Sequence, residues 1–387
     1  MQRIPPFKAL DIFRGFAAIW VVMVHSCDRW LSDGNQAYLH VPLYSFSMRG
    51  QLGVVMFFVI SGYCITAAAY SALVSGKSIW RYSYERVRRI YPPYLVALVL
   101  TVVAAMVVAY ANNHHLIGQV HHLQTFPASP KYWIANLLLL QSEFDTPMVN
   151  VVFWSLCYEV AFYFIIGLFL KSGQWISARR NPRAGAIWFI CCVGGSTVIA
   201  LSWLIAFNGA GFPFDMWHQF SIGGLLFFLL ELKPSTVSYY DKSLRNVIWI
   251  NVTATTALII AFAILRQVGE VDLGHPSSKV RCVVCLLFCL LLIALRPIDA
   301  KLSENKLLKP LMWVGAFSYS LYLTHPVVLP FVDILSRKAG LNGPRYIIAF
   351  WIQVAVAIAF GRLFYWLIER HFISKRQVQR LVAEHVA

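Results

Sequence analysis

The stretch LDIFRGFAAIWVVMVHS, from Leu10 to Ser26, is apolar enough to enter a lipid bilayer as a helix. It nevertheless carries Asp11, Arg14 and His25, and ionisable side chains of this kind are costly in hydrocarbon. Arg14 and His25 are eleven positions apart, which on a helix is about three turns, so they share a face and lie roughly 16 Å apart along the axis. This polar stripe within a bilayer indicates a functional site. The alternative is that Asp11 and Arg14 snorkel at the membrane edge while His25 caps the far edge.

The composition predicts an all-α, polytopic integral membrane protein. The chain has 387 residues, of which 59% are hydrophobic and only 13% charged, about half the charged fraction of an ordinary soluble protein. Apolar runs of about 20 residues recur along the whole chain, too long and continuous for the strands of a membrane barrel. The net charge of +16 is typical of a nucleic-acid-binding protein. The basic residues sit in particular loops, however, so the positive-inside rule is the simpler explanation and we expect no nucleic-acid partner.

We predict ten transmembrane helices and one short helix in a single membrane-embedded domain over residues 1–387. The short segment, Trp133 to Gln141, cannot cross a bilayer at 1.5 Å per residue, so we interpret it as a re-entrant or interfacial helix. The ten predicted spans cover residues 9–27, 52–73, 90–111, 151–170, 186–207, 216–232, 247–265, 280–296, 311–333 and 346–369.

The distribution of basic residues orients this map. With a cytoplasmic N-terminus, 22 of the 33 Lys and Arg residues fall in inner segments and 9 in outer segments, while Arg14 and Arg362 lie inside spans. Cytoplasmic loops of membrane proteins carry such an excess of Lys and Arg, so both termini are predicted to be cytoplasmic.

Two features lie near the second and third spans. The segment GQLGVVMFFVISGYCIT, residues 50–66, contains Ser61 among glycines, and small residues of this kind let membrane helices approach closely. The basic cluster Lys77–Arg89 follows, with Arg86 and Arg89 three apart on one helix face. This cluster is open to three interpretations: a topology signal, a contact to anionic lipid, or a cradle for phosphates.

Two further ionisable residues fall inside predicted spans. Glu159, in WSLCYE (residues 154–159), can orient a histidine, act as a base, or form a structural ion pair. His325, in SYSLYLTH (residues 318–325), is followed by Pro326, which frees backbone groups at a kink. A site role and a hydrogen-bonded core histidine remain alternatives for His325.

The eight cysteines give no sign of a metal centre. Most lie inside apolar spans, where cysteine behaves as a small hydrophobic residue. Cys282 and Cys285 form a C-x-x-C pair, but no second ligand pair accompanies it, so we expect no metal.

Taken in order, these motifs resemble the acyltransferase-type-three family of integral membrane acyl-transfer enzymes. The resemblance covers essentially the whole chain and rests on an ordered set of motifs: R-x10-H from Arg14 to His25, FFVISG at residues 57–62, R-x-x-R from Arg86 to Arg89, WSLCYE at residues 154–159 and SYSLYLTH at residues 318–325. Each motif alone is weak, whereas the ordered set is specific.

The resemblance implies transfer of an acyl group, usually acetyl, from cytoplasmic acyl-CoA to a hydroxyl of a cell-surface glycan or lipid-linked oligosaccharide. His25 would be the catalytic histidine, acting as general base or transient acyl carrier, with Arg14 as its partner and Glu159 or His325 assisting. The donor, acetyl-CoA, would be held by Arg86 and Arg89.

The resemblance also sets further expectations about the chain and its surroundings. We predict that Ser61 and Tyr322 help to bind the donor, and that the protein lies among the lipids of the bacterial inner membrane. Some family members carry an extra extracytoplasmic SGNH-type hydrolase domain, which we expect this chain to lack.

Two other functions compete with this prediction. Intramembrane His, Glu and Arg also mark proton-coupled transporters of small anionic or sugar substrates, but no internal repeat or matching pair of broken spans is apparent. A structural partner in polysaccharide export is a third alternative, which the intact Arg14, His25 and Glu159 argue against.

Overall fold

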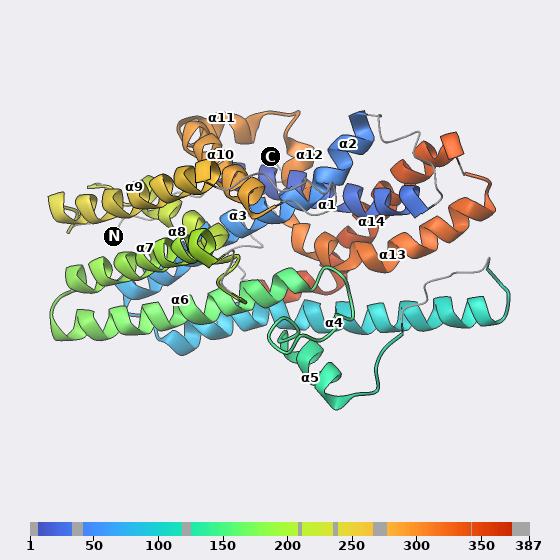
Figure 1. Ribbon diagram of the computed structural model, residues 1–387, viewed down its shortest axis with the longest axis horizontal. Coiled ribbons are helices and arrows are strands. Elements are labelled where there is room, and N and C mark those ends of the chain that lie inside the picture. The colour runs from blue at the N-terminus through green and yellow to red at the C-terminus, as the bar shows by residue number, and fades with distance from the viewer. Residues whose placement is uncertain are drawn as a thin grey trace. The chain divides into compact units, whose positions relative to one another are not determined.

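In a computed structural model, the residues that the structure describes, 7–32, 42–117, 125–207, 211–234, 239–265, 277–341 and 343–373, form helices and connecting segments without a β-strand (Figure 1). Both chain ends, and with them the predicted cytoplasmic termini, lie outside this range. The predicted all-helical class is confirmed. The helices are α1 (Ala9–Ser32), α2 (Pro42–Met48), α3 (Leu52–Ser75), α4 (Ile79–Asn113), α5 (Pro130–Leu138), α6 (Trp154–Arg179), α7 (Pro182–Phe207), α8 (Trp217–Glu231), α9 (Lys242–Leu265), α10 (Ser278–Leu295), α11 (Asp299–Glu304), α12 (Lys309–Ala316), α13 (Ser318–Lys338) and α14 (Tyr346–Leu367).

Within the described ranges, 8 helical segments are long and apolar enough to cross a membrane. The predicted number of ten is therefore not confirmed, because two of the predicted spans do not meet these requirements. The span predicted at 216–232 is the 15-residue α8, which is short for a crossing. The span predicted at 311–333 is interrupted at Phe317, which separates α12 from the polar first turns of α13.

Other boundaries also differ from the prediction. Helix α4 begins at Ile79, so most of the basic cluster is helical, and Pro92 and Pro93 lie inside the helix. The short helix predicted from Trp133 to Gln141 is α5, which begins three residues earlier. Ser129 is its N-cap residue with Pro130 in the first turn, and it ends at Leu139, whose φ of 57° is left-handed.

The chain divides into two compact units. Unit 1 comprises Met1–Arg14, Val54–Arg86 and Tyr158–Met312. Unit 2 comprises Gly15–Gly53, Val87–Cys157 and Trp313–Ala387.

In unit 1, α8 is enclosed by other helices. It packs against α7, α9 and α10, and nearly all of its residues are buried, which explains how a helix of this length is retained among longer ones. Figure 1 shows α6 and α7 running antiparallel and joined by a tight turn. Helices α3 and α8 meet backbone to backbone at small residues: an added Cβ on Gly62 would lie 1.8 Å from the Phe220 carbonyl oxygen.

We expect Gly62→Ala to lower thermal stability in detergent, because neither backbone can make room for the methyl group. Overpacking of this kind costs about 1–3 kcal/mol. Gly195→Ala on α7 is the matched control, since a Cβ there meets nothing within 4 Å, and a helix-interior glycine replaced by alanine is neutral or gains about 0.5–1 kcal/mol. Equal melting temperatures for the two variants would contradict the close packing of α3 on α8.

Unit 1 also contains a buried charge network at the C-terminal end of α8. Arg296 donates to both carboxylate oxygens of Glu231, at 2.8 and 3.1 Å, and Tyr63 of α3 donates to the same carboxylate at 2.8 Å. Asp299 accepts hydrogen bonds from the backbone N–H groups of Lys8 and Ala9 at 3.1 and 2.7 Å. A carboxylate at this position satisfies the first N–H groups of α1 and favours the positive end of its dipole.

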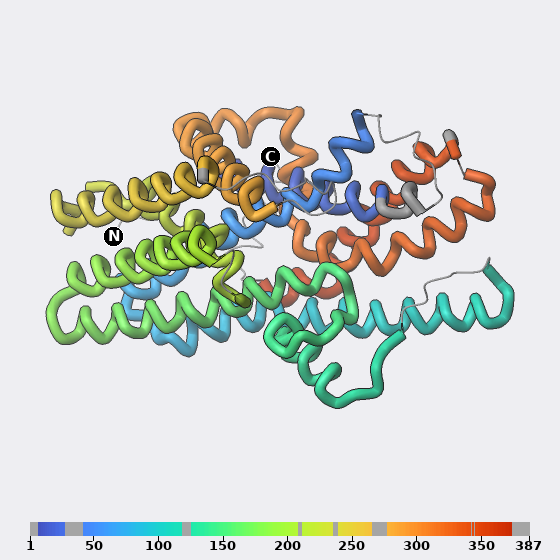
Figure 2. The backbone as a smooth tube through the Cα atoms, in the orientation of Figure 1, coloured from blue at the N-terminus to red at the C-terminus, as the bar shows by residue number. Residues whose placement is uncertain are grey.

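In unit 2, the main framework is the antiparallel pair α13 and α14, drawn in orange and red in Figure 2. Gly361 of α14 lets the two helices approach closely, since an added Cβ would lie 2.8 Å from the Leu321 Cα. Helix α2 packs on α1 through Trp20, whose indole N–H donates to the Phe46 carbonyl at 2.7 Å while the two rings stack 5.1 Å apart.

Candidate active site

The sequence-predicted site residues are carried by both units. Helix α1 is unbroken from Ala9 to Ser32, so the prediction that Arg14 and His25 share one helix is confirmed. Arg14 belongs to unit 1 and His25 to unit 2.

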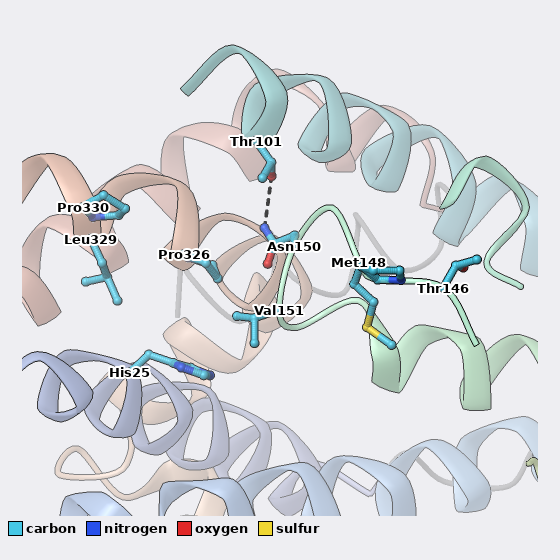
Figure 3. Close-up of a pocket in the computed structure, with 10 residues that line it drawn as sticks. His25, Thr101, Thr146, Met148, Asn150, Val151, Pro326, Leu329 and Pro330 are labelled. Carbon is cyan, nitrogen blue, oxygen red and sulfur yellow. Dashed lines mark hydrogen bonds between the residues drawn. The ribbon is translucent and has the colours of Figure 1, made fainter. Parts of the chain in front are cut away.

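His25 borders a cavity of about 630 Å³ in unit 2 (Figure 3). The other polar side chains of its lining are Thr101 on α4 and Thr146 and Asn150 on the segment between α5 and α6. The remaining lining is apolar and comes from that segment and from α13. A volume of this size lies within the range of roughly 300–1,000 Å³ that is usual for small-molecule sites.

His325 lies directly beside His25. The centroids of the two rings are 5.2 Å apart, and the His325 side chain is fully buried. Its Nδ1 is 3.1 Å from the carbonyl oxygen of Leu321, one helical turn earlier. A carbonyl only accepts hydrogen bonds, so Nδ1 carries the proton and Nε2 of the neutral ring is an acceptor. Among the described residues Nε2 has no hydrogen-bond partner.

Pro326 explains part of the polarity at this point of α13. A proline has no N–H, so the carbonyl of Tyr322 loses its helical donor. Pro330, one turn further on, frees the carbonyl of Pro326 itself, which lines the cavity. These two carbonyl groups, which lack a helical donor, therefore make the part of α13 next to His25 polar.

Tyr322 connects His325 to the start of α6. Its ring centroid is 6.0 Å from that of His325. Its hydroxyl lies 2.7 Å from the Ser155 hydroxyl and donates to the Val152 carbonyl at 3.1 Å. Unit 2 therefore brings His25, His325 and Tyr322 together, while the predicted role of Tyr322 in donor binding stays a prediction.

A second group of predicted residues meets in unit 1. Ser61 on α3 and Tyr163 on α6 both donate to the same carboxylate oxygen of Glu159, at 2.7 and 2.6 Å. The two donors, which come from different helices, therefore hold the Glu159 side chain in one position.

Arg14 lies within electrostatic range of this carboxylate. Its guanidinium donates to Asp11 at 3.1 Å and lies 3.2 Å from the Cys64 sulfur. Asp11 and Arg14 therefore form an ion pair along one turn of α1, and both are mostly buried. Unit 1 thus brings Arg14, Ser61 and Glu159 together.

The two arginines of the R-x-x-R motif lie on consecutive turns of α4, Arg86 at the end of unit 1 and Arg89 at the start of the next segment of unit 2. The Arg86 guanidinium lies 5.9 Å from the centroid of the Tyr82 ring. Both side chains are half-buried. The predicted i, i+3 spacing on one helix is confirmed.

A third polar cluster, which the sequence analysis did not identify, lies at the N-terminal end of α8. The Tyr158 hydroxyl donates to Asp215 at 2.9 Å, and Arg281 lies close enough to Asp215 to interact with its charge. Burial raises the pKa of the Asp215 carboxyl, and the hydrogen bond from Tyr158 partly opposes this shift. Next to it, His218 Nε2 lies 3.3 Å from the Cys282 sulfur. No group of three metal-ligating side chains occurs among the described residues.

Comparison with known proteins identifies the family. A family model described as an acyltransferase domain, Acyl_transf_3, matches residues 7–370. The chain belongs to this acyltransferase family. Because the match covers all five motifs of the resemblance, the predicted family is confirmed.

Curated relatives of the acyltransferase include O-acetyltransferases. The chain is 25% identical to a protein of Staphylococcus aureus (strain COL) named "Putative O-acetyltransferase", over 96% of this chain and 58% of the relative. It is 22% identical to O-acetyltransferase OatA of Staphylococcus aureus (strain NCTC 8325 / PS 47), over 90% of this chain and 55% of OatA. The chain thus spans just over half the length of these relatives. No solved structure matches it.

For the acyltransferase, the two groups of residues have different chemical capacities. The histidine pair of unit 2 offers a proton acceptor beside a cavity, which is the requirement for activating a hydroxyl. The Arg14, Ser61 and Glu159 group of unit 1 offers a guanidinium, a hydroxyl and a carboxylate held by hydrogen bonds. Family membership favours the acyltransferase prediction over the proton-coupled transporter.

Several residues of these groups were missed by the sequence analysis. Tyr163 follows Glu159 by four positions on α6, and this i, i+4 spacing is a signal that was available. Thr101 gave no such signal, because its contact with Asn150 joins segments 49 residues apart in the chain.

Proposed function

We propose that this protein is a membrane O-acetyltransferase of the bacterial inner membrane, with both termini in the cytoplasm. It transfers an acetyl group from cytoplasmic acetyl-CoA to a hydroxyl of a cell-surface glycan or lipid-linked oligosaccharide. The observation that carries the proposal is the position of His25 on a cavity, next to a second histidine, in a chain of the acyltransferase family.

In the proposed reaction His25 acts as the general base. An imidazole nitrogen accepts the proton of the acceptor hydroxyl while its oxygen attacks the thioester carbonyl. The tetrahedral intermediate then collapses, the carbon–sulfur bond breaks, and the CoA thiolate takes the proton back from the imidazolium. In a variant of this scheme the imidazole itself carries the acetyl group between donor and acceptor.

The remaining predicted residues have supporting roles in this proposal. His325 orients His25, because its buried Nε2 is an acceptor next to that ring. Arg14 and Glu159 supply the charges that stabilise the reacting groups, as the family resemblance implies. Arg86 and Arg89 bind the phosphates of acetyl-CoA, with Ser61 and Tyr322 as further donor-binding residues.

The test is acetyl transfer by the full chain purified into lipid nanodiscs. Labelled acetyl-CoA and glycan from a strain that lacks the gene are supplied, and the acetylated product is identified by mass spectrometry. We expect label in ester linkage on the glycan and release of free CoA. Uptake of a substrate into proteoliposomes without any acetyl transfer would contradict the proposal and favour a transporter.

Neutralising the R-x-x-R pair is expected to weaken donor binding. A hydrogen bond to a charged group contributes about 1.5–3 kcal/mol, so Arg86→Gln and Arg89→Gln should each reduce acetyl-CoA affinity by about tenfold or more. Equilibrium binding of labelled acetyl-CoA measures this. Arg81→Gln is the control on the same helix, because Arg81 is exposed and already paired with Glu85. Unchanged affinity in the double variant would reject the donor-binding role.

A further inference from the structure

The wall of the cavity opposite His25 is built from the segment between α5 and α6, and one buried side chain holds it in place. Asn136 of α5 is fully buried. Its Nδ2 donates to the Pro147 carbonyl at 3.1 Å, and its Oδ1 accepts from the Val149 N–H at 2.9 Å. The residues on both sides of Met148 are therefore bound to the same amide, so Met148 is held at the cavity by a defined backbone.

The polar part of the wall is also fixed before any ligand binds. Asn150 donates from Nδ2 to the Thr101 hydroxyl at 3.0 Å, shown as the dashed line in Figure 3. Its Oδ1 accepts from the Val152 N–H at 3.2 Å, and Thr101 in turn donates to the Ala97 carbonyl at 2.8 Å. The buried hydroxyl of Thr146 has no hydrogen-bond partner among the described residues.

The charge of the lining is the decisive property. Among the residues that the structure describes, its polar groups are one histidine, one amide and two hydroxyls, and the other six residues are Pro147, Met148, Val151, Pro326, Leu329 and Pro330. This described part of the lining contains no Lys or Arg that could pair with an anion and no carboxylate that could pair with a cation. An ionised group that packs against such a lining loses part of its hydration and gains no charged partner there.

The donor and this cavity are also separated along α4. Arg89 and Thr101 are both on this helix in unit 2, twelve positions and so roughly 18 Å apart along its axis. Acetyl-CoA carries several phosphate charges, which suit the basic end of α4 and not the uncharged cavity.

From these observations we infer that the cavity is the acceptor subsite and that it selects an uncharged sugar unit over an acidic one. The inference rests on the proposed acetyltransferase function. The apolar lining packs on the C–H faces of the sugar ring, and one hydroxyl of the ring faces His25, while the hydrogen bonds of Asn150 keep this wall in shape. Met148 and Val151 determine the size and charge of the sugar unit that the cavity binds.

The test compares two glycosides that differ only in charge. The full chain in nanodiscs receives acetyl-CoA with a nitrophenyl glucoside or the corresponding nitrophenyl glucuronide. We expect kcat/KM to be at least about tenfold higher for the glucoside, because the carboxylate would lose hydration against the lining without gaining a charged partner. Binding of each glycoside without donor is measured by saturation-transfer NMR, so the comparison has a second readout. Equal use or binding of the two glycosides, no binding of either, or preference for the glucuronide would overturn the inference.

A charge-introducing variant sharpens this comparison. Val151 lines the cavity and is itself 58% exposed, so it tolerates substitution. Val151→Lys should shift the ratio of glucuronide to glucoside turnover upward by about tenfold, since the ammonium pairs with the carboxylate. Val151→Met is the matched control of similar length without charge and should leave the ratio unchanged. The same ratio in both variants would count against the assignment.

A third variant distinguishes an effect on binding of the acceptor from an effect on binding of the donor. Met148→Trp fills the cavity and is expected to raise KM for the glucoside by about tenfold while KM for acetyl-CoA changes by less than about twofold. The opposite pattern would assign the cavity to the donor and overturn the inference. Failure of the proposed function is distinguishable, because it would abolish His25-dependent acetyl transfer to native glycan as well as to both glycosides.

Discussion

Replacing His25 with alanine is expected to lower acetyl transfer by about 10²–10⁴-fold, the contribution typical of a general base, while the folded protein remains in the membrane. His25 is half-buried beside the cavity of unit 2, and its ring faces that of His325 at 5.2 Å between centroids. Without the imidazole, the described polar side chains of the cavity lining are two hydroxyls and an amide. These groups are poor acceptors for the proton of the acceptor hydroxyl. The loss should therefore appear in kcat rather than in binding of acetyl-CoA.

The measurement uses nanodisc-embedded protein, labelled acetyl-CoA and native glycan, with thermal stability recorded for each variant. His114→Ala is the control, because His114 is an exposed histidine at the end of α4 that lies against Tyr110. His325→Ala should retain more activity than His25→Ala, because His325 acts through the other ring. Activity of His25→Ala within a few fold of wild type, with normal stability, would reject the role assigned to His25.

Labelling of the wild-type protein distinguishes the two forms of the mechanism. If the imidazole carries the acetyl group, incubation with acetyl-CoA alone should leave label on the peptide that contains His25. If it acts only as a base, label appears solely on the acceptor. Either result is compatible with the proposed function, and the two differ in the number of acetyl transfers per turnover.

The largest expected effect on stability comes from Glu231→Ala. Glu231 is 3% exposed and pairs with Arg296, which is 15% exposed. Removing one member of a buried ion pair costs about 3–5 kcal/mol, and Arg296 would keep only its longer contact with Asp299, at 3.6 Å. The variant also takes away the acceptor of the Tyr63 hydroxyl. We expect a strongly lowered melting temperature in detergent, or failure to accumulate in the membrane.

Glu85→Ala is the matched control for this prediction. Its partner Arg81 is on the same helix face, and the two side chains are 41% and 70% exposed. Exposed pairs contribute about 0.2–1 kcal/mol, so this variant should unfold at nearly the wild-type temperature. Glu231→Gln should fall between the two, because its amide still accepts hydrogen bonds from Arg296 and Tyr63 without the charge. A Glu231→Ala melting temperature equal to that of Glu85→Ala would show that the buried pair contributes little.

The helical elements of this protein were predictable because lipid leaves the backbone few alternatives. A run of apolar residues in a bilayer must satisfy its own N–H and C=O groups, so length and composition alone located α1, α3, α4, α6, α7, α9, α10 and α14. The predicted spans that are not confirmed lie where a helix is enclosed by protein or interrupted by a polar turn. Buried among other helices, α8 needs only 15 residues, and the predicted span at 311–333 is broken at Phe317.

The candidate site was predictable only where its residues are close in sequence. The chain by itself determined that Arg14 and His25 share one helix, that Arg86 and Arg89 occupy consecutive turns of another, and that Glu159 lies in an apolar segment, since these follow from helical periodicity. Tertiary structure alone decided that Ser61 bonds Glu159, that His25 faces His325, and that Asn136 holds the cavity wall. The physical reason is that most of these helices are apolar on every side, so amphipathicity does not say which face turns inward. That choice is made by close packing at small residues and by hydrogen bonds between segments up to hundreds of residues apart.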